Sequence, residues 1–190
     1  YAGVEQLRHA CRVAPARRYH HGDLRPVLLD EVREIIRQQG VGFVSIREVA
    51  RRARVSHAAP AHHFGSKSGL LTAFAIQGYE RLAALTSERI AGAGVSSPRD
   101  VLAVMGQAYV EFAVANPEHF GIMYPGDALN RRDPDFRRAS ERCYGPLVDV
   151  VRRADAEGYL DRDVETLTAA AWALVHGLAS FWPGGVVAPG

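Results

Sequence analysis

The stretch from Ser45 to Leu71 limits the possible folds of this chain more than any other part of its 190 residues. Ser45 is a typical helix N-cap, and apolar residues recur after it at helical spacing, at Ile46, Val49, Ala50 and Ala53. Arg54 and Val55 are predicted to form a turn, and Ser56 to cap a second helix. That helix has only one large apolar side chain, Phe64, so it is suited to presenting a surface rather than to building a core.

The remaining side chains of the second helix are small or polar. Ala58, Ala59 and Ala61 allow close approach, while Ser56, His57 and His62 can form hydrogen bonds. A recognition helix in a DNA major groove needs this combination. The alternative is an ordinary structural pair of short helices, because such pairs are common in all-α proteins.

The segment Gly65–Gly69, with the sequence GSKSG, favours the DNA-binding interpretation. It is predicted to end one helix and to start the next, with Ser66 as the cap and Lys67 in the first turn. A lysine at this place opposes the helix dipole, which favours acidic residues. Free backbone N–H groups at a helix start can bind phosphate, so an anionic partner is indicated. The segment lacks the spacing and the preceding strand of a nucleotide-binding loop.

Three segments of the chain resemble the N-terminal domain of the TetR family of transcriptional regulators: YHHGDLR at 19–25, IREVARRARVSHAAPAHHF at 46–64 and SKSGLL at 66–71. The SHAAP segment and Trp172…His176-Gly177 are similar to a branch of that family with a Trp-His-Gly signature in its C-terminal domain. The resemblance implies an all-α fold, in which a three-helix helix-turn-helix domain precedes a helical bundle for ligand binding and dimerisation. Together with the pattern above, it places DNA contacts at Ser45, Arg47, Ser56, His57, Ala58, Ala59, His62, His63 and Lys67.

Two positions depart from the family pattern. Arg54 stands where the family usually has the glycine of the turn, so the turn is expected to form around a non-glycine residue. Ala61 stands where an aromatic residue, commonly tyrosine, often contacts a phosphate. One backbone contact is therefore expected to be missing.

The charge distribution agrees with an N-terminal nucleic-acid-binding part. Residues 1–80 carry 12 Lys and Arg against 7 Asp and Glu, whereas residues 81–190 carry 11 against 14. Only the first part is therefore suited to a polyanion. We expect a poorly ordered arm at 1–18, the helix-turn-helix domain at 19–66 and a regulatory and dimerisation domain at 67–190. Basic residues of the arm could also add phosphate contacts.

The C-terminal part is predicted to consist of helices joined by loops at Pro98, Asn116–Pro117, residues 126–135 and Gly158. Its aromatic, methionine and histidine side chains have two interpretations. They could be an ordinary bundle core, or the wall of a small-molecule pocket, in which tyrosine, tryptophan and histidine direct polar atoms at a ligand. With the resemblance, the pocket is favoured. Its predicted residues are Met105, Tyr109, Phe112, Phe120, Met123, Tyr124, Tyr144, Trp172 and His176.

The sequence argues against several other classes of protein. Cys11 and Cys143 are too few for a disulfide framework, and no apolar run is long enough for a membrane span. The adjacent pairs His20-His21 and His62-His63 lack metal-ligand spacing. No nucleophile, base and acid form a recognisable set, so neither an enzyme nor a cofactor is expected.

These features together predict a bacterial, cytoplasmic repressor that binds a palindromic double-stranded DNA operator as a homodimer. An unidentified small, largely apolar effector is expected to release it. The last helix, rich in alanine, is the expected dimer seam, with Ala171 and Ala179 as test positions. The helix after Ser66 is expected to transmit the signal. Two alternatives remain: a regulator that activates or responds to a protein partner, and a remnant of a ligand-binding enzyme.

Overall fold

The computed structural model describes residues 24–124 and 128–181. Within them the chain forms only helices: α1 (Leu24–Gln39), the 3-10 helix η2 (Val41–Phe43), α2 (Ile46–Ala53), α3 (Ala58–Phe64), α4 (Lys67–Ala93), α5 (Pro98–Ala115), α6 (Pro117–Met123), α7 (Pro134–Ala156) and α8 (Val164–Phe181). The predicted all-α fold is confirmed. The predicted arm at 1–18, the motif residues 19–23 and the segment after Phe181 lie outside the described residues.

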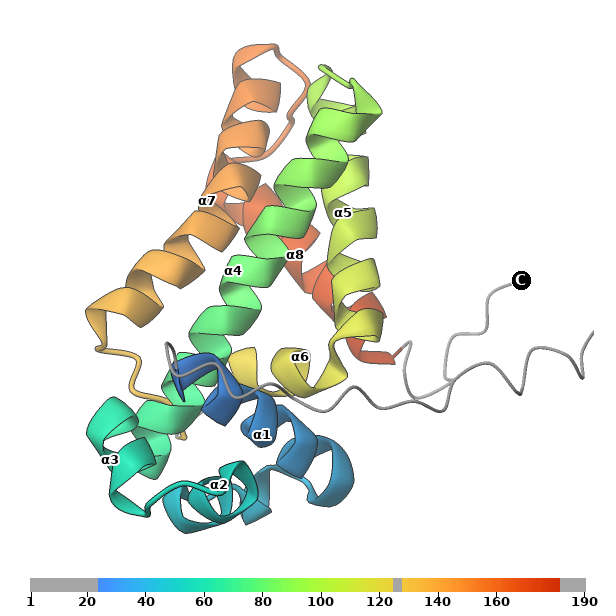
Figure 1. Cartoon of the computed structure of the whole chain (residues 1–190). Helices are drawn as coiled ribbons and strands as arrows, with labels where there is room; N and C mark the ends of the chain where they lie inside the picture. Colours follow the sequence, from blue (N-terminus) through green and yellow to red (C-terminus); the bar gives the residue numbers. More distant parts are fainter. Residues whose placement is uncertain (1–23, 125–127, 182–190) are drawn as a thin grey trace, which may run out of the picture.

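Helices α1, α2 and α3 form a head at one end of the molecule (Figure 1). Helix α4 leaves this head and runs through the other half, where it packs against α5, α6 and α7. Helix α8 crosses behind α4 and contacts α5 and α7. The short helix α6 lies between the two halves and contacts α1 as well as α4 and α5.

Local sequence signals account for most of the helix starts. The hydroxyl oxygens of Ser45 and Ser66 accept hydrogen bonds from the backbone N–H groups of Glu48 and Gly69, each at 3.1 Å, as expected of N-caps. Asp163 caps α8 by accepting from the N–H of Thr166 at 2.8 Å. The predicted cap at Ser56 is wrong. Helix α3 begins at Ala58 after His57, with no side-chain cap, and Ser56 instead accepts from Ala59 through its carbonyl group.

The core of the head is built from the apolar faces of its helices. Leu28, Val32 and Ile35 of α1 and Val49 of α2 are fully buried, and Leu70 and Phe74 of α4 continue this core beyond the head. Because α4 shares the same core as α1 and α2, it is rigidly attached to the head by packing as well as by the chain. Helix α4 continues to Ala93, well beyond the head.

Candidate functional site

The turn between α2 and α3 forms around Arg54, as expected from the sequence. Arg54 has φ 56° and ψ 41°, and it is the only non-glycine residue with positive φ in the described part of the chain. Its N–H group donates to the carbonyl group of Arg51, and that of Val55 to Ala50, which closes the end of α2. This left-handed conformation costs a residue with a Cβ atom about 1–2 kcal/mol. The turn is therefore held by its hydrogen bonds and by the packing of Val55.

Helix α3 presents most of its side chains to solvent. Pro60 and Phe64 are its buried residues, and the guanidinium carbon of Arg25 lies 5.1 Å from the centre of the Phe64 ring. The predicted contact residues His57, Ala58, His62 and His63 are exposed, and Ala59 is half-buried. The structure therefore places these residues on one exposed helix, beside the exposed residues Ser56 and Lys67.

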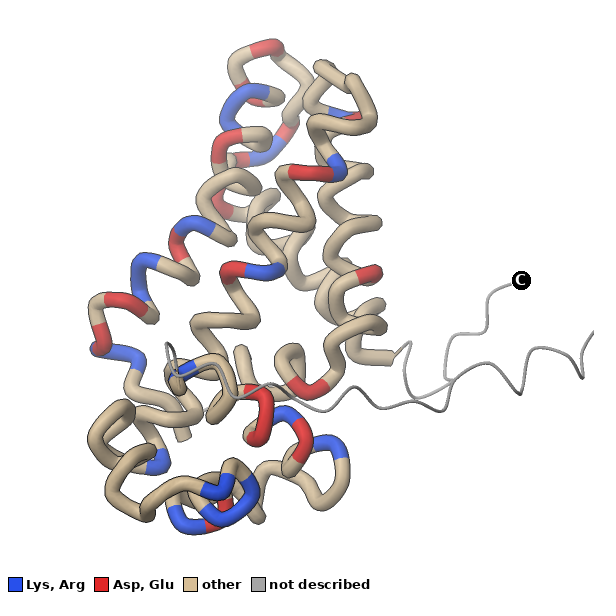
Figure 2. The backbone as a smooth tube through the Cα atoms, viewed as in Figure 1, with Lys and Arg blue, Asp and Glu red and all other residues tan. Residues whose placement is uncertain are grey.

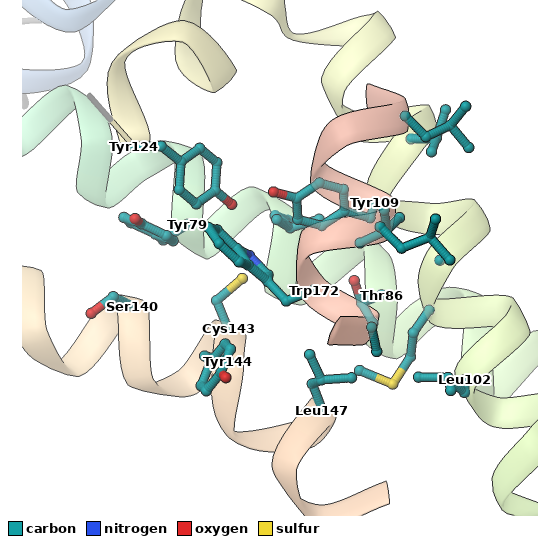
Figure 3. Close-up of a pocket in the computed structure, with 18 of the residues that line it drawn as sticks. Tyr79, Thr86, Leu102, Tyr109, Tyr124, Ser140, Cys143, Tyr144, Leu147 and Trp172 are labelled. Atoms are coloured by element: carbon teal, nitrogen blue, oxygen red, sulfur yellow. The ribbon is translucent and has the colours of Figure 1, made fainter. Parts of the chain in front are cut away.

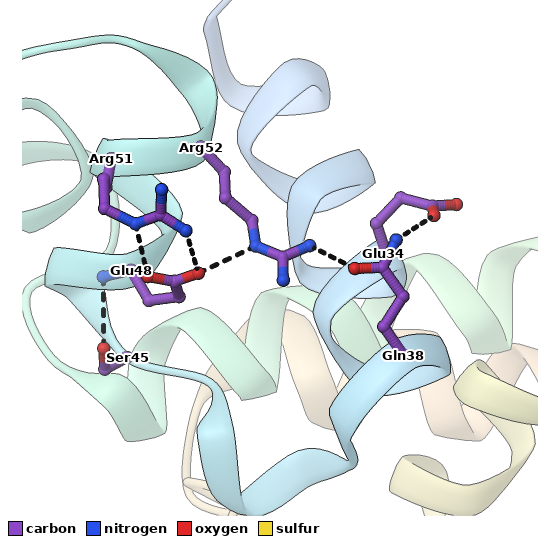
Figure 4. A network of polar contacts seen from close by, with 6 residues as sticks. All are labelled: Glu34, Gln38, Ser45, Glu48, Arg51 and Arg52. Atoms are coloured by element: carbon purple, nitrogen blue, oxygen red, sulfur yellow. Dashed lines mark hydrogen bonds and ion pairs between the residues drawn. The ribbon is translucent and has the colours of Figure 1, made fainter.

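The arginines of α2 do not all project freely into solvent. Glu48 accepts hydrogen bonds from Arg51 and Arg52, and Arg52 also donates to the side chain of Gln38 on α1 (Figure 4). The side chain of Arg52 is only 15% exposed. These donors lower the pKa of Glu48 to about 2, so its charge persists at acidic pH. Arg47 has no ion pair among the described residues and is exposed, so it remains available to a partner.

Lys67 has an intramolecular partner that the sequence did not suggest. Its ammonium group donates to the carbonyl oxygen of Gly42 at 3.1 Å, across the start of α4. The side chain thereby links α4 to the 3-10 segment before α2. It is nevertheless exposed, and an ammonium group has two further donors for a phosphate oxygen. Figure 2 marks in blue the positions of the basic residues along the backbone of the head.

The other half of the molecule contains a cavity of about 1040 Å³ between α4, α5, α7 and α8 (Figure 3). Tyr109, Tyr124 and Trp172 form an aromatic wall, and Leu82, Met105 and Leu147 extend the cavity with apolar side chains. The volume is near the upper end of the range found for small-molecule sites. This part of the chain is therefore not a solid core.

The cavity includes five of the nine residues predicted for it. Met105, Tyr109, Tyr124, Tyr144 and Trp172 line it, whereas Phe112, Phe120, Met123 and His176 do not. Phe112 and Met123 are fully buried in the main core. Phe120 and His176 lie behind the aromatic wall, where His176 stacks on Trp172 with ring centres 4.9 Å apart. Phe120 and His176 therefore support the wall from behind, and none of the four residues lines the cavity.

Several residues that line the cavity were not predicted from the sequence, because neither their type nor their spacing marks them as part of a site. Tyr79 and Thr86 of α4, Cys143 of α7 and Val175 of α8 line the cavity. Arg131, Ser140 and Glu141 also line it and supply polar groups. Arg131 donates to the carbonyl oxygen of Tyr124 at 2.8 Å, which attaches the connection between α6 and α7 to the wall. The spacing of such loop and α7 residues gave no indication of a common site.

The tyrosine hydroxyl groups of the wall are partly satisfied within the protein. Tyr79 donates to the carbonyl oxygen of Met123 at 2.9 Å, and the hydroxyl group of Tyr109 lies 2.8 Å from Nδ1 of His176. Burial raises the pKa of Tyr79 to about 12 and also raises the pKa values of Tyr109 and Tyr124. Burial likewise raises the pKa of the Cys143 thiol to about 12. These tyrosine and cysteine side chains are therefore neutral at physiological pH, and Arg131 and Glu141 are the charged residues that line the cavity.

Helix α6 gives the cavity a second connection to the head, in addition to α4. Tyr124 follows the last residue of α6, and His119 on the same helix stacks on Phe74 of α4 with ring centres 4.0 Å apart. Since α6 also contacts α1, the two regions are joined by this short helix as well as by the long helix α4. Gly78 permits this packing, because a Cβ atom there would lie 2.7 Å from the sulfur atom of Met123.

His119 should make the stability of the protein depend on pH. It is fully buried, its Nε2 atom lies 3.0 Å from Oε1 of Gln77, and its Nδ1 atom has no partner. Burial and the charges of Arg81 and Arg33 lower its pKa to about 3. His119 therefore binds a proton more readily in the unfolded chain than in the folded protein. Its contribution to the free energy of unfolding is complete above pH ~6.5 and is lost as the pH falls toward 3.

Between pH 7 and pH 5 we expect His119 to reduce the free energy of unfolding by about 2 kcal/mol. Urea denaturation at the two pH values measures this loss. His119→Phe, which keeps the stacking on Phe74, should remove this part of the pH dependence. An unchanged slope in the variant would show that other groups cause it.

Of the two test positions for a dimer seam, Ala179 is fully buried within the protomer and Ala171 lines the cavity. The exposed large apolar side chains of α8 are Leu174, Leu178 and Phe181. Within residues 24–124 and 128–181, no group of His, Cys, Asp and Glu side chains could hold a metal ion. No described helix is both long and apolar enough to cross a membrane.

Comparison with known protein families shows which family this chain belongs to. Residues 28–74 match the model of the bacterial regulatory proteins of the tetR family, and residues 102–187 match that of a tetracyclin repressor-like C-terminal domain. The two matches together cover more than half of the chain. The chain belongs to the TetR family. The first match contains α2, α3 and the start of α4, and the second contains most of the cavity wall.

Solved structures agree with this assignment. A protein with unknown function from Rhodococcus sp. RHA1 is 33% identical, with a TM-score of 0.75 over 92% of this chain and 91% of that chain. The TetR family transcriptional regulator PfmR from Thermus thermophilus is 22% identical, with a TM-score of 0.65 over 81% and 85%. A putative tetR family regulator from Shewanella sp. PV-4 is 17% identical, with a TM-score of 0.71 over 86% and 87%. No curated protein matches the sequence.

Membership of the TetR family makes this protein a transcriptional regulator with a DNA-binding helix-turn-helix domain. Regulators of this family bind DNA, usually dimerise and are generally not enzymes. The exposed helix α3 is the second helix of the helix-turn-helix pair, and the cavity lies in the regulatory half.

Proposed function

We propose that this TetR-family protein is a cytoplasmic homodimeric repressor that leaves a palindromic operator when a small, largely apolar molecule binds in its cavity. The observation that carries the proposal is the aromatic-walled cavity of about 1040 Å³ in the half of the molecule opposite the head. A bundle that served only for association would have no need of such a volume, since an empty apolar cavity is destabilising.

The head is proposed to contact DNA through two kinds of residue. His57, Ala58, Ala59, His62 and His63 lie on or directly before α3 and would face base edges in the major groove. Ser45, Arg47, Ser56 and Lys67 lie at helix starts or on α2 and would contact phosphates. A single head offers few contacts, so two heads about 34–36 Å apart would be needed for tight binding.

The effector would act by changing the separation of the two heads. Tyr124 belongs to the cavity wall and adjoins α6, and α6 contacts α1 in the head. A ligand that displaces Tyr124 would therefore shift α6 against α1, while α4 carries the same displacement through the shared core. The ligand needs different affinities for the two head spacings, and a coupling of ~1–3 kcal/mol changes operator affinity ~5- to 150-fold.

Two measurements test this function. Native mass spectrometry of the purified protein should detect a small molecule bound to the dimer, and fluorescence anisotropy should show that the same compound lowers affinity for the operator. A compound that raises operator affinity would indicate an activator. If no bound molecule is found and no compound from an apolar library changes operator binding, a regulator that responds to a protein partner would replace this proposal.

Lys67→Ala should weaken binding to all DNA sequences to a similar extent. Loss of one phosphate contact should reduce the slope of log affinity against log salt by about one unit. Anisotropy with operator and with unrelated DNA at several salt concentrations measures both effects. Lys67→Arg serves as the control, because it keeps the charge and a donor for the carbonyl group of Gly42.

The histidines of α3 should behave differently in the same assay. His62→Ala should change which bases are preferred and leave the salt slope nearly unaltered, because a base contact releases no counterion. Unrelated DNA that binds to Lys67→Ala as tightly as to the wild type would contradict a phosphate contact at Lys67.

A further inference from the structure

Electric charge is confined to one end of the cavity. Among the described residues that line it, Arg131 and Glu141 are the ones that carry a charge at neutral pH. Arg131 donates to the carbonyl oxygen of Tyr124 at 2.8 Å, and Glu141 directly follows Ser140 in α7. Figure 3 shows Tyr124 and Ser140 toward one side of the cavity and Leu102 toward the other. The cavity therefore has a charged end and a largely apolar remainder.

The guanidinium group of Arg131 is held in place by the protein itself. The connection that contains it is attached to α4, because the N–H group of Asn130 donates to the hydroxyl oxygen of Thr72 at 2.9 Å. Leu129 in the same connection is buried in the main core. The hydrogen bond from Arg131 to Tyr124 then fixes the side chain. A group that is already ordered loses little conformational entropy when it binds a ligand, which favours affinity.

Arg131 has binding capacity that the described part of the protein does not use. Its hydrogen bond to Tyr124 occupies one N–H donor of the guanidinium group, and it forms no ion pair within residues 24–124 and 128–181. Further donors therefore remain for a ligand. The charge of Arg131 also acts inside the cavity: burial raises the pKa of Tyr79 to about 12, and Arg131 acts in the opposite direction.

We propose that Arg131 binds the carboxylate group of an amphipathic effector, whose apolar body fills the remainder of the cavity. A guanidinium group presents paired N–H donors that match the two oxygen atoms of a carboxylate. Arg131 is exposed, so the bound carboxylate keeps contact with water and does not bear the full cost of desolvation. Glu141 at the same end disfavours a second negative charge, so the effector carries a single carboxylate. The inference rests on the proposed ligand-responsive regulator and names the chemical class of its effector.

Three probes with the same apolar chain test the charge. Decanoate, decan-1-ol and decylammonium are titrated into the wild-type protein at neutral pH and constant salt, with isothermal titration calorimetry as the measurement. Decanoate should bind about 10- to 100-fold more tightly than decan-1-ol, the factor expected for hydrogen bonds to a charged group. Equal affinities for these two probes, or no binding of decanoate at millimolar concentration, would overturn the inference. Decylammonium that binds more tightly than decanoate would make Glu141 the anchoring group and would overturn it as well.

Arg131→Gln is the decisive variant. It should lower the affinity for decanoate by about tenfold or more and leave the affinity for decan-1-ol unchanged, since glutamine can still donate to the carbonyl group of Tyr124. Arg132→Gln is the matched control, because Arg132 is the next residue of the same connection, is exposed and does not line the cavity. Equal losses for both probes in Arg131→Gln would show that Arg131 only holds the wall, which contradicts a carboxylate site.

Glu141→Gln is a second variant and should have the opposite effect. Removal of the negative charge beside the bound carboxylate should raise the affinity for decanoate by about 2- to 5-fold, as expected for one exposed charge pair. The affinity for decan-1-ol should not change. This variant keeps Arg131, so it tests the site even if Arg131→Gln does not fold. An unchanged affinity for decanoate would mean that no carboxylate binds at this end of the cavity.

Operator affinity, measured by fluorescence anisotropy with the same probes, separates this inference from the proposed function. Decanoate that binds through Arg131 and lowers operator affinity supports both. Decanoate that binds through Arg131 without a change in operator affinity would leave the carboxylate site in place and argue against its role as an effector site. Release of the operator by an uncharged compound, with decanoate and decan-1-ol bound equally well, would leave the regulator in place and overturn the inference.

Discussion

Gly69→Ala should lower the free energy of unfolding by about 2–3 kcal/mol, as overpacking does, and should abolish tight operator binding. A Cβ atom at position 69 would lie only 2.0 Å from the carbonyl oxygen of Phe64. That oxygen belongs to the backbone at the end of α3 and already accepts from the N–H group of Ser66 at 2.8 Å. The methyl group can therefore be accommodated only if α3 moves away from α4, and this displaces the helix proposed to enter the major groove.

Gly92→Ala is the matched control for this substitution. Gly92 lies in the same helix α4, and a Cβ atom there would meet nothing within 4 Å. Because glycine in a helix is about 0.5–1 kcal/mol less favourable than alanine, this variant should be slightly more stable than the wild type. Thermal and urea denaturation give the stabilities, and anisotropy gives the affinities. Wild-type stability and affinity in Gly69→Ala would disprove the close contact between α3 and α4.

Gly106→Trp should abolish the response to the effector while operator binding stays intact. Gly106 lines the cavity, and a Cβ atom there would meet only Val175, at 3.9 Å, so the indole ring would extend into the cavity. An occupied cavity excludes the guest and leaves the head unchanged. We expect the fall in operator affinity, ~5- to 150-fold for typical coupled sites, to disappear. Ala171→Trp tests the same cavity from α8.

Gly92→Trp is the control here, because position 92 faces open space and lies outside the cavity wall. The measurement is anisotropy on operator DNA, titrated with a compound that releases the wild type. If the compound releases Gly106→Trp and Ala171→Trp from the operator at the same compound concentration as the wild type, the effector site lies elsewhere. Ala113→Trp would be a poor test, since Ala113 is fully buried and does not line the cavity.

The sequence was sufficient for the order of the helices, because the signals at their ends are local. Ser45 and Ser66 accept the expected cap hydrogen bonds, Gly158 has φ 76° after α7, and Asn116-Pro117 separates α5 from α6. The start of α3 was placed wrongly, because no side chain caps it and packing of Pro60 and Phe64 fixes it instead.

Which residues line the cavity depends on how the helices pack against one another. The spacing of residues along the sequence does not reveal this packing. Tyr109 and Phe112 are three positions apart on α5 and so lie near the same face, yet Tyr109 borders the cavity and Phe112 is buried in the main core. Arg131 and Glu141 are exposed charged residues of a connection and of α7, and only the folded arrangement brings them to the cavity. In the same way, Arg52 has the sequence context of a free surface arginine, but Glu48 and Gln38 bind it.

The exposure of most side chains of α3 has an evolutionary consequence. Pro60 and Phe64 are the buried residues that attach this helix to the core, whereas Ala58, Ala61, His62 and His63 are exposed. Substitutions at exposed positions generally change stability by less than ~0.5 kcal/mol. If α3 contacts DNA as proposed, the two copies that follow a gene duplication can acquire different DNA targets through these four positions without loss of the fold. The half that contains the cavity can stay unchanged while the DNA target diverges.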